Sequence, residues 1–188
     1  QEHDGGKALH LDGTSNYLDV KTLDGTSLLT RVKEMTVSFQ AKPEAGRANW
    51  PFYAAPDANG QTNQKERYLG ILEKDGTITA ERYNNTNRRP SSAWTTTDAE
   101  DWYYVTVVQT EQESIIYIDG EEKARQSSAY ALTDILGEDS ILYIGKANWG
   151  NGEYYKGWLD NLTIRNYAMT AEEIAADIAG TPEDPGEL

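Results

Sequence analysis

Carboxylate side chains spaced two residues apart are the first groups in this sequence that could carry out chemistry. Hydrolysis of a glycosidic bond needs two carboxylates about 5–10 Å apart on a rigid surface, which a pair on one strand would supply. The acidic pairs are Glu111 with Glu113, Asp119 with Glu121, Asp98 with Glu100 and Asp101, and Glu138 beside Asp139. All lie in or beside predicted turns, where acids are usually solvated. We therefore predict no catalytic residues and no enzymatic activity.

Other residue types that carry chemistry are scarce. The chain has no cysteine and only two histidines, which excludes disulfides, thiolate metal sites and a cysteine nucleophile, and makes a Ser-His-Asp triad hard to build. The sequence also lacks the nucleophile-elbow, zinc-protease, P-loop and dinucleotide-binding motifs. A metal ion bound by this chain must therefore have oxygen ligands.

One acid stands in an unusual position. In the segment GWLDNLTIRN, strand alternation places Asp160 on the same face as Trp158, Leu162 and Ile164. An ionised carboxylate on an apolar face is costly unless it is paired or coordinated. Two interpretations follow: a calcium ion bound by this carboxylate and nearby carbonyls, or a β-bulge at Asp160 and Asn161 that turns the acid outwards or lets it cap backbone amides.

Aromatic residues are mostly tyrosine and tryptophan, with 12 Tyr and 5 Trp against 2 Phe. Their rings have a flat apolar face and a polar edge, which suits both cores and binding surfaces. Three segments combine aromatic and turn residues without regular alternation, and we predict that they form rim loops: Asn49–Ala55, Arg82–Trp94 and Lys146–Gly157.

These predicted loops could form a surface on which a sugar ring stacks. Trp149 is the predicted main platform, with Arg82 or Arg89 binding sugar hydroxyls. The full set of predicted ligand-binding residues is Trp149, Trp50, Tyr53, Arg82, Tyr83, Arg89, Asn148 and Tyr154. The alternative is that several of the aromatic rings close the open ends of the fold.

The elements that must position these side chains are β-strands. Asp-Gly and Asn-Gly pairs recur along the chain and favour tight hairpin turns, most clearly at Asp75-Gly76 and Asp119-Gly120. Between them, segments such as MTVSFQA alternate apolar and polar residues with a period of two. We predict strands at Ala8–Leu11, Tyr17–Val20, Met35–Ala41, Arg67–Leu72, Thr77–Tyr83, Trp102–Thr110, Ser114–Ile118, Ile141–Ile144 and Trp158–Arg165.

A single short helix is predicted near the end of the chain. Thr170 and Glu173 form a capping box, and Gly180 and Pro182 stop the helix. We expect Ile174 and Ile178 to pack on a sheet edge. Many short antiparallel strands in one domain predict an all-β, two-sheet antiparallel sandwich (jelly roll) over residues 1–180, followed by a linker-like tail at 181–188.

Charge and hydropathy limit the partners. The formal net charge is −14, which is the wrong sign for binding nucleic acid or an anionic membrane. No apolar run approaches the roughly 20 residues that cross a bilayer. We therefore predict neither nucleic-acid binding nor membrane insertion.

Four segments resemble the laminin-G-like, concanavalin A-like jelly-roll domains in their order and motifs: ALHLDGTSNYLDV, MTVSFQAKP, IIYIDGEEKA and LYIGKANWGNGEYYKGWLDNLTIRNYAMTAEEIAA. The resemblance covers about residues 7–179. It implies a mostly non-catalytic fold that often serves as a carbohydrate-binding module, with a structural calcium near the closing strand. Asp160 matches the acid of that family, and Asp12, Thr14 and Ser15 are the co-ligands that the resemblance then suggests.

The resemblance implies a carbohydrate-binding module of a secreted bacterial glycoside hydrolase or surface protein. Its expected partners are an oligosaccharide or polysaccharide and the adjacent domains of a larger parent protein. The alternative is a structural or protein-interaction spacer domain of the same fold, without a sugar site.

Overall fold

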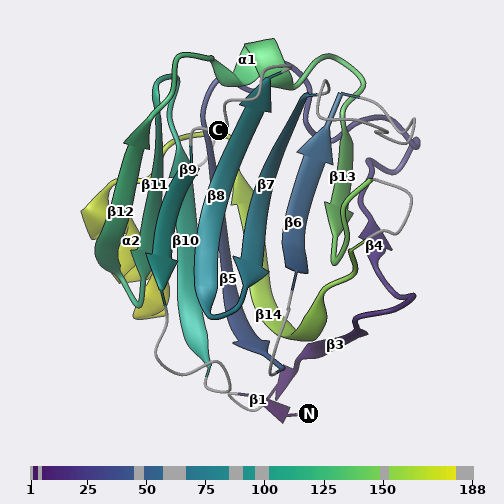
Figure 1. The fold of residues 1–188 in the computed structure, drawn as a ribbon, viewed down its shortest axis with the longest axis vertical. Helices are drawn as coiled ribbons and strands as arrows, with labels where there is room; N and C mark the ends of the chain where they lie inside the picture. Colours follow the sequence, from purple (N-terminus) through teal and green to yellow (C-terminus); the bar gives the residue numbers. More distant parts are fainter. Residues whose placement is uncertain are drawn as a thin grey trace.

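Two antiparallel β-sheets packed face to face make up the protein (Figure 1). The structure is a computed structural model, and it describes residues 2–3, 6–44, 49–56, 67–84, 91–95, 102–148 and 153–180. The predicted all-β sandwich with a short C-terminal helix is confirmed. The predicted tail at 181–188 lies outside the described residues.

The back sheet has six strands in the order β12-β11-β10-β5-β14-β3. Its central strand, β5, pairs with β10 on one side and with β14 on the other, so that Val37 lies between Val107 and Ile164. The strands of this sheet are β3 (Leu9–Asp12), β5 (Met35–Pro43), β10 (Tyr103–Gln109), β11 (Glu113–Ile118), β12 (Glu121–Ser127) and β14 (Lys156–Arg165).

The front sheet has six strands in the order β4-β13-β6-β7-β8-β9. Its strands are β4 (Leu18–Asp19), β6 (Asn49–Ala55), β7 (Arg67–Lys74), β8 (Thr77–Asn84), β9 (Ser91–Thr95) and β13 (Ile141–Ile144). A separate two-stranded pair joins β1 (Glu2–His3) to β2 (Gly6–Lys7).

The hydrophobic core lies between the two sheets. Alternate residues of each strand point inward, such as Val37 and Phe39 from the back sheet and Phe52, Leu69 and Ile71 from the front sheet, and all five are buried. Burial of one such apolar side chain contributes about 1.5–3 kcal/mol. The apolar residues of MTVSFQA face the core as their period of two predicts, but Thr36 and Ser38 on the opposite face are buried as well.

Both predicted hairpins are confirmed. Asp75 and Asp119 have positive φ angles of 53° and 50°, and the glycines that follow them have φ angles of 72° and 82°. Two successive left-handed residues form the tight turn whose twist matches that of the flanking strands. The turns join β7 to β8 and β11 to β12.

Helix α2 (Ala171–Ile178) begins at the predicted capping box. The backbone N–H of Glu173 donates to Thr170 Oγ1 at 3.2 Å, and the N–H of Thr170 donates to Glu173 Oε2 at 2.6 Å. Ile174 packs with Val108 and Ile115 on the outer face of the back sheet. The expected packing on a sheet edge is therefore wrong, and Ile178 is 37% exposed. A shorter helix, α1 (Leu132–Ile135), was not predicted.

The predicted rim loops are only partly loops. Residues Asn49–Ala55 form strand β6, which is buried on both faces. Phe52 and Ala54 face the core, while Trp50 and Tyr53 face the other way. Residues 82–84 end β8, and β9 begins at Ser91. Within residues 146–157, only 146–148 and 153–155 are described outside a strand. No helix among the described residues is long and apolar enough to span a membrane.

Candidate functional site

Aromatic side chains gather on the outer face of the front sheet. Trp50 and Tyr53 come from β6, Tyr68 from β7, Tyr83 from β8 and Tyr143 from β13, and these five residues are called the aromatic face here. They lie side by side because Tyr53 pairs with Tyr143 and Tyr68 pairs with Tyr83 across neighbouring strands. The alternation that sends Phe52 and Leu69 inward sends these rings outward.

The rings of the aromatic face pack against one another. The Trp50 ring centroid lies 5.8 Å from those of both Tyr53 and Tyr68 in edge-to-face arrangements, and Tyr53 stacks on Tyr68 at 5.5 Å. Gly70 leaves room for the indole, since a Cβ atom there would lie 2.5 Å from Trp50 Cζ3. Such contacts fix ring positions beyond what apolar burial alone achieves.

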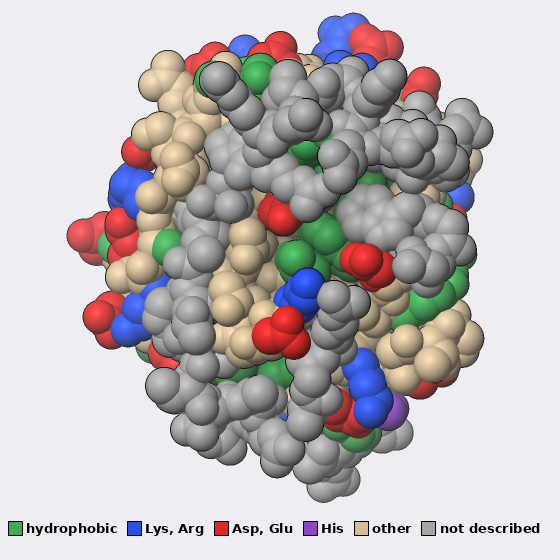
Figure 2. Space-filling view, in the orientation of Figure 1, with side chains coloured by type: hydrophobic (Ala, Val, Ile, Leu, Met, Phe, Trp, Pro, Cys, Tyr) green, Lys and Arg blue, Asp and Glu red, His purple; other side chains and the backbone are tan. Residues whose placement is uncertain are grey.

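Two carboxylates are built into this face. The Tyr68 hydroxyl donates a hydrogen bond to Glu81 of β8, and the Trp50 indole N–H donates to Glu153 Oε2 at 2.8 Å. Figure 2 shows hydrophobic and acidic side chains together in the middle of this side of the molecule. Rings with carboxylates at their polar edges can present both a stacking surface and acceptors for hydroxyl groups.

The structure corrects the expected exposure of three predicted site residues. Trp50, Tyr53 and Tyr83 lie on strands rather than rim loops, and their exposed fractions are 3%, 0% and 2%. These three side chains pack inside the aromatic face and have almost no solvent-accessible surface that a ligand could contact. The alternative, in which such rings close the open ends of the fold, does not describe them either, because they lie on the outer face of the front sheet.

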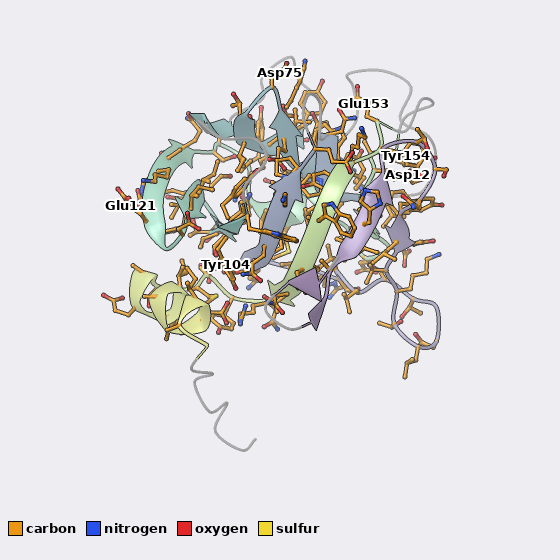
Figure 3. All side chains as sticks on the ribbon, turned by 90° about the horizontal axis from the view of Figure 1, so that it is seen from below. Asp12, Asp75, Tyr104, Glu121, Glu153 and Tyr154 are labelled. Carbon is orange, nitrogen blue, oxygen red and sulfur yellow. The ribbon has the colours of Figure 1, made fainter. Side chains whose placement is uncertain are left out.

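The accessible part of the face lies at its edge, beside β4 and β13. Tyr17 is 37% exposed, and its ring lies 5.4 Å from Tyr143 and 6.2 Å from Tyr154 between centroids. The Lys146 ammonium lies 3.8 Å from the Tyr17 ring centroid and 4.5 Å from that of Tyr143. These residues, Tyr17, Tyr143, Lys146 and Tyr154, are called the tyrosine edge. Figure 3 shows Tyr154 and Glu153 toward one end of the sandwich, on the same side as Asp12.

The tyrosine edge contains one predicted residue and adjoins another. Tyr154 is half-buried, with its carbonyl accepting a hydrogen bond from Asn49 Nδ2 at 2.9 Å, and Asn148 is also half-buried. Trp149 and Arg89 lie outside the described residues. Sequence reasoning missed Tyr17 and Lys146, because Tyr17 sits in a predicted strand and Lys146 carries no motif.

Arg82, which was predicted to bind ligand from a rim loop, is instead buried inside the sandwich. It points between the sheets, is fully buried, and donates from its two terminal nitrogens to five acceptors. These are the carbonyls of Glu111, Tyr130, Thr110 and Glu113 at 3.2, 3.0, 2.7 and 2.9 Å, and Gln109 Oε1 at 2.7 Å. Burial lowers the pKa of Arg82 to about 10. The side chain is a structural tie from β8 to the turn between β10 and β11.

A second buried ionisable residue, Glu73, was not anticipated. Its carboxyl group lies between the sheets and accepts hydrogen bonds from the hydroxyls of Tyr103 and Tyr155, the latter at 3.2 Å. Burial raises the pKa of Glu73 to about 8, and burial also raises the pKa of Tyr155. The group is therefore mostly protonated at neutral pH. It faces the core and does not reach the aromatic face.

The predicted calcium ligands are not brought together. Asp12 of β3 pairs with Lys156 of β14. Lys156 precedes Asp160 by four residues, so the backbones of Asp12 and Asp160 are separated by about 13 Å along the strand direction. Asp12 Oδ1 accepts hydrogen bonds from the N–H groups of Thr14 and Ser15 at 2.8 and 2.9 Å, and Oδ2 accepts from Ser15 Oγ at 2.8 Å. These bonds hold the pKa of Asp12 well below its usual range. Asp12 thus closes its own turn.

Asp160 lies at the predicted β-bulge. The pairing of β14 with β5 shifts between Asp160 and Thr163, and Asn161 has a φ angle of 49°. Asp160 Oδ1 accepts the N–H of Asn161 at 2.8 Å. Among the described residues, no three His, Asp or Glu side chains are grouped to hold a metal ion. The predicted ligand set does not fit one ion, and calcium binding by other oxygens stays a prediction.

Comparison with known proteins places this fold in a family. Residues 12–175 match the laminin G-type family model described as the concanavalin A-like lectin/glucanases superfamily. The chain belongs to this superfamily. A search of curated proteins found no match.

Solved structures with the same fold include sugar-binding and lectin-like domains. Domain 4 of an extracellular family-43 arabinanase from Geobacillus stearothermophilus, in complex with arabinotriose, has a TM-score of 0.71, 20% identity and coverage of 95% of this chain and 79% of that one. The family-40 carbohydrate-binding module of a Ruminococcus gnavus sialidase, bound to α2,3-sialyllactose, has a TM-score of 0.74, 14% identity and coverage of 94% and 97%. A pentraxin from Limulus polyphemus has a TM-score of 0.66, 18% identity and coverage of 90% and 80%. At these identities the three likenesses show a shared fold.

Proposed function

We propose that this chain is a non-catalytic carbohydrate-binding module that binds an oligosaccharide at the tyrosine edge. The observation that carries the proposal is the half-exposed ring of Tyr17, packed beside Tyr154 and covered by the Lys146 ammonium. The named structural neighbours support it, because two of them are bound to arabinotriose and sialyllactose. The family membership supports the same proposal at the level of fold.

The chemistry of the edge suits a small sugar site. Tyr17 and Tyr154 offer ring faces for the C–H surface of a sugar, and tyrosine loses little conformational entropy on binding. The Lys146 ammonium can donate hydrogen bonds to hydroxyl groups, and the Asn148 amide can both donate and accept them. A millimolar affinity requires only about 4 kcal/mol net, which one stacked ring and a few hydrogen bonds can supply.

The parent protein is part of the same proposal. We infer a secreted or surface-attached bacterial protein, such as a glycoside hydrolase, in which this domain binds glycan near an adjacent catalytic domain. The extracellular arabinanase domain and the sialidase module are examples of the same fold in such proteins.

A glycan array followed by isothermal titration tests the proposal. The array, run with calcium and with EDTA, identifies a bound glycan, and titration measures its affinity for the wild type and for Tyr17→Ala and Tyr154→Ala. We expect each substitution to weaken binding by about tenfold, which corresponds to roughly 1.4 kcal/mol.

Tyr167→Ala is the matched control for these variants. Tyr167 is 43% exposed, similar to Tyr17 at 37%, but it lies in the segment between β14 and α2. Its loss should leave the affinity unchanged. If no glycan on the array binds, the domain is a spacer of the same fold. If a glycan binds but the three variants bind it equally well, the site is not the tyrosine edge. Either result overturns the proposal.

A further inference from the structure

A second cleft lies on the outer face of the back sheet, on the opposite side of the sandwich from the aromatic face. It has a volume of about 860 Å³, which falls within the range of small-molecule sites. Its floor comes from β5, β10 and β14, and α2 lines one side. The lining residues that define the α2 cleft here are Gln40, Trp102, Tyr104, Asp119, Asn161, Thr163 and Asp177.

Hydrogen bonds fix the wall that joins the sheet to α2. The Tyr104 hydroxyl donates to Asp177 Oδ2 at 2.8 Å, and Arg165 donates to Asp177 Oδ1 at 2.6 Å. Arg165 also donates to Thr163 Oγ1 at 2.7 Å. Figure 3 shows Tyr104 on the side of the sheet that faces the helix. Because Asp177 is already paired with a guanidinium, its charge is largely compensated.

The floor of the cleft carries polar groups in a defined arrangement. Asn161 Nδ2 donates to Gln40 Oε1 at 2.6 Å, which ties β14 to β5 at the bulge. The left-handed backbone of Asn161, with φ at 49°, directs an amide side chain onto this face at a strand position. Asparagine tolerates this conformation better than most residues. On the other side of the floor, Asp119 Oδ1 accepts the N–H of Tyr104 at 2.9 Å.

The residue types in the cleft select for a neutral polyhydroxylated ligand. Among the described residues that line it, none is lysine or arginine, and the uncompensated carboxylate of Asp119 would repel an anion. Carboxylate and amide oxygens accept hydrogen bonds from hydroxyl groups, while the half-buried Trp102 and Tyr104 offer ring surface. A simple cation would meet only one uncompensated carboxylate, that of Asp119.

We propose that the α2 cleft is a second binding site that takes one or two residues of a neutral sugar, independently of the tyrosine edge. The two sites would lie on opposite faces of one sandwich. A single domain could then contact two glycan segments.

Nuclear magnetic resonance of the ¹⁵N-labelled full chain can separate the two sites. The indole N–H of Trp102 reports on the α2 cleft. The indole N–H of Trp50 donates to Glu153, beside Tyr154, and reports on the tyrosine edge. Trp→Phe variants assign both signals. The probes are arabinotriose, maltotriose, xylotriose and lactose as neutral sugars, 3′-sialyllactose as an anion and putrescine as a cation. We expect at least one neutral sugar to shift the Trp102 signal saturably below about 50 mM.

Two variants test the residues that carry the proposal. Asn161→Gly retains the left-handed backbone and removes the amide, and Asp119→Asn retains its turn and removes the charge. Each should weaken sugar binding at Trp102 by about fivefold, the effect of one lost or weakened hydrogen bond. Asp75→Asn is the matched control, because Asp75 occupies the same type of turn at φ 53° away from the cleft. Melting curves establish that each variant is folded.

The outcomes test the α2 cleft independently of the sugar site proposed at the tyrosine edge. If neutral sugars leave the Trp102 signal unmoved while resonances at the tyrosine edge respond, the second site is wrong and the proposed function stands. If Trp102 responds and the edge does not, the second site stands alone. Unchanged affinity in both Asn161→Gly and Asp119→Asn, or a response to putrescine or sialyllactose in place of neutral sugars, also overturns the second site.

Discussion

At the scale of single residues, an arginine and a glutamate are buried between the sheets, where a purely apolar sandwich would hold neither. Arg82 and Glu73 both point inward, toward opposite ends of the β7–β8 hairpin. Burial of a charge is costly unless hydrogen bonds compensate it. Arg82 donates hydrogen bonds to five acceptors, which compensate its buried charge. Glu73 instead keeps its proton, so that no charge is buried.

Replacement of Arg82 should be strongly destabilising. Arg82→Met keeps most of the side-chain volume but removes the five hydrogen bonds that Arg82 donates to four carbonyls and to Gln109 Oε1. We expect the free energy of unfolding to fall by about 3–5 kcal/mol, measured by urea denaturation. Arg67→Met is the control, since Arg67 is exposed and its NH1 donates to the carbonyl of Asp134. An equal loss in both variants would contradict the role given to Arg82.

Glu73 should make stability depend on pH. The pKa of its buried carboxyl is raised to about 8 in the folded chain from an ordinary value of 4.5. Between pH 4.5 and about 8 the folded state holds a proton that the unfolded state has released. The contribution of Glu73 to the free energy of unfolding therefore falls as the pH rises through this range, by up to about 1.4 kcal/mol per pH unit. Below pH 4.5 both states are protonated and the contribution is constant.

Glu73→Gln tests this linkage. The amide has the shape of the protonated acid, and it can hydrogen-bond to Tyr103 and Tyr155 without ionising. We expect the variant to be more stable than the wild type at pH 8 and to have a flatter stability profile from pH 5 to 8, measured by urea denaturation at each pH. Parallel profiles for the two proteins would show that another group controls the dependence.

At the scale of elements, the strand pattern predicted the sheets better than it predicted which face each side chain occupies. Asp-Gly turns and the capping box at Thr170 depend on neighbours in sequence, and both are confirmed. The strand RYLGILEK is buried on both faces, so alternation alone could not assign Tyr68 outward and Glu73 inward. The sequence left open whether a bulge forms at Asp160 and Asn161, because a bulge depends on how β14 pairs with β5, which lies far away in the sequence.

The candidate site was harder to predict for the same reason. Aromatic residues near turns suggested exposed rings, yet Trp50 and Tyr53 belong to a strand whose outer face is also covered. Tyr17 and Lys146 become neighbours only because β4 pairs with β13, more than 120 residues later in the chain. No short motif contains that information.

Gly70 should be required for the packing of the aromatic face. An alanine Cβ atom at this position would lie 2.5 Å from Trp50 Cζ3, closer than van der Waals contact allows. We expect Gly70→Ala to displace the indole, weaken its bond to Glu153 and destabilise the fold by about 1–3 kcal/mol. Tryptophan fluorescence and urea denaturation measure these effects. Gly137→Ala is the control, because no atom lies within 4 Å of a Cβ at that position.

The turn after β3 should depend on Asp12 but not on calcium. Both carboxylate oxygens of Asp12 already accept hydrogen bonds from residues 14 to 16. Asp12→Ala should therefore lower the melting temperature by the same amount in calcium and in EDTA. A larger drop in calcium would show that Asp12 is a ligand after all. The wild-type curves in the two conditions test separately whether the chain binds calcium elsewhere, which would raise its stability.

At the scale of the whole molecule, the two sheets share one core from residue 11 to residue 159. A core that draws on both sheets should unfold as a single cooperative unit. We expect one thermal transition, with the same midpoint by far-ultraviolet circular dichroism and by tryptophan fluorescence. Two separated midpoints would contradict the prediction of one domain over residues 1–180.

The position of β14 has a consequence for how this chain is made. Strand β5, at residues 35–43, lies at the centre of the back sheet and pairs on one side with β14, at residues 156–165. During synthesis, β5 leaves the ribosome long before β14 has been made. Until then, the backbone N–H and C=O groups on the β14 side of β5 have no native partner. Folding that depends on such distant pairing is slow. The back sheet can close only after the last strand has emerged, and until then the apolar face of β5 needs protection from aggregation.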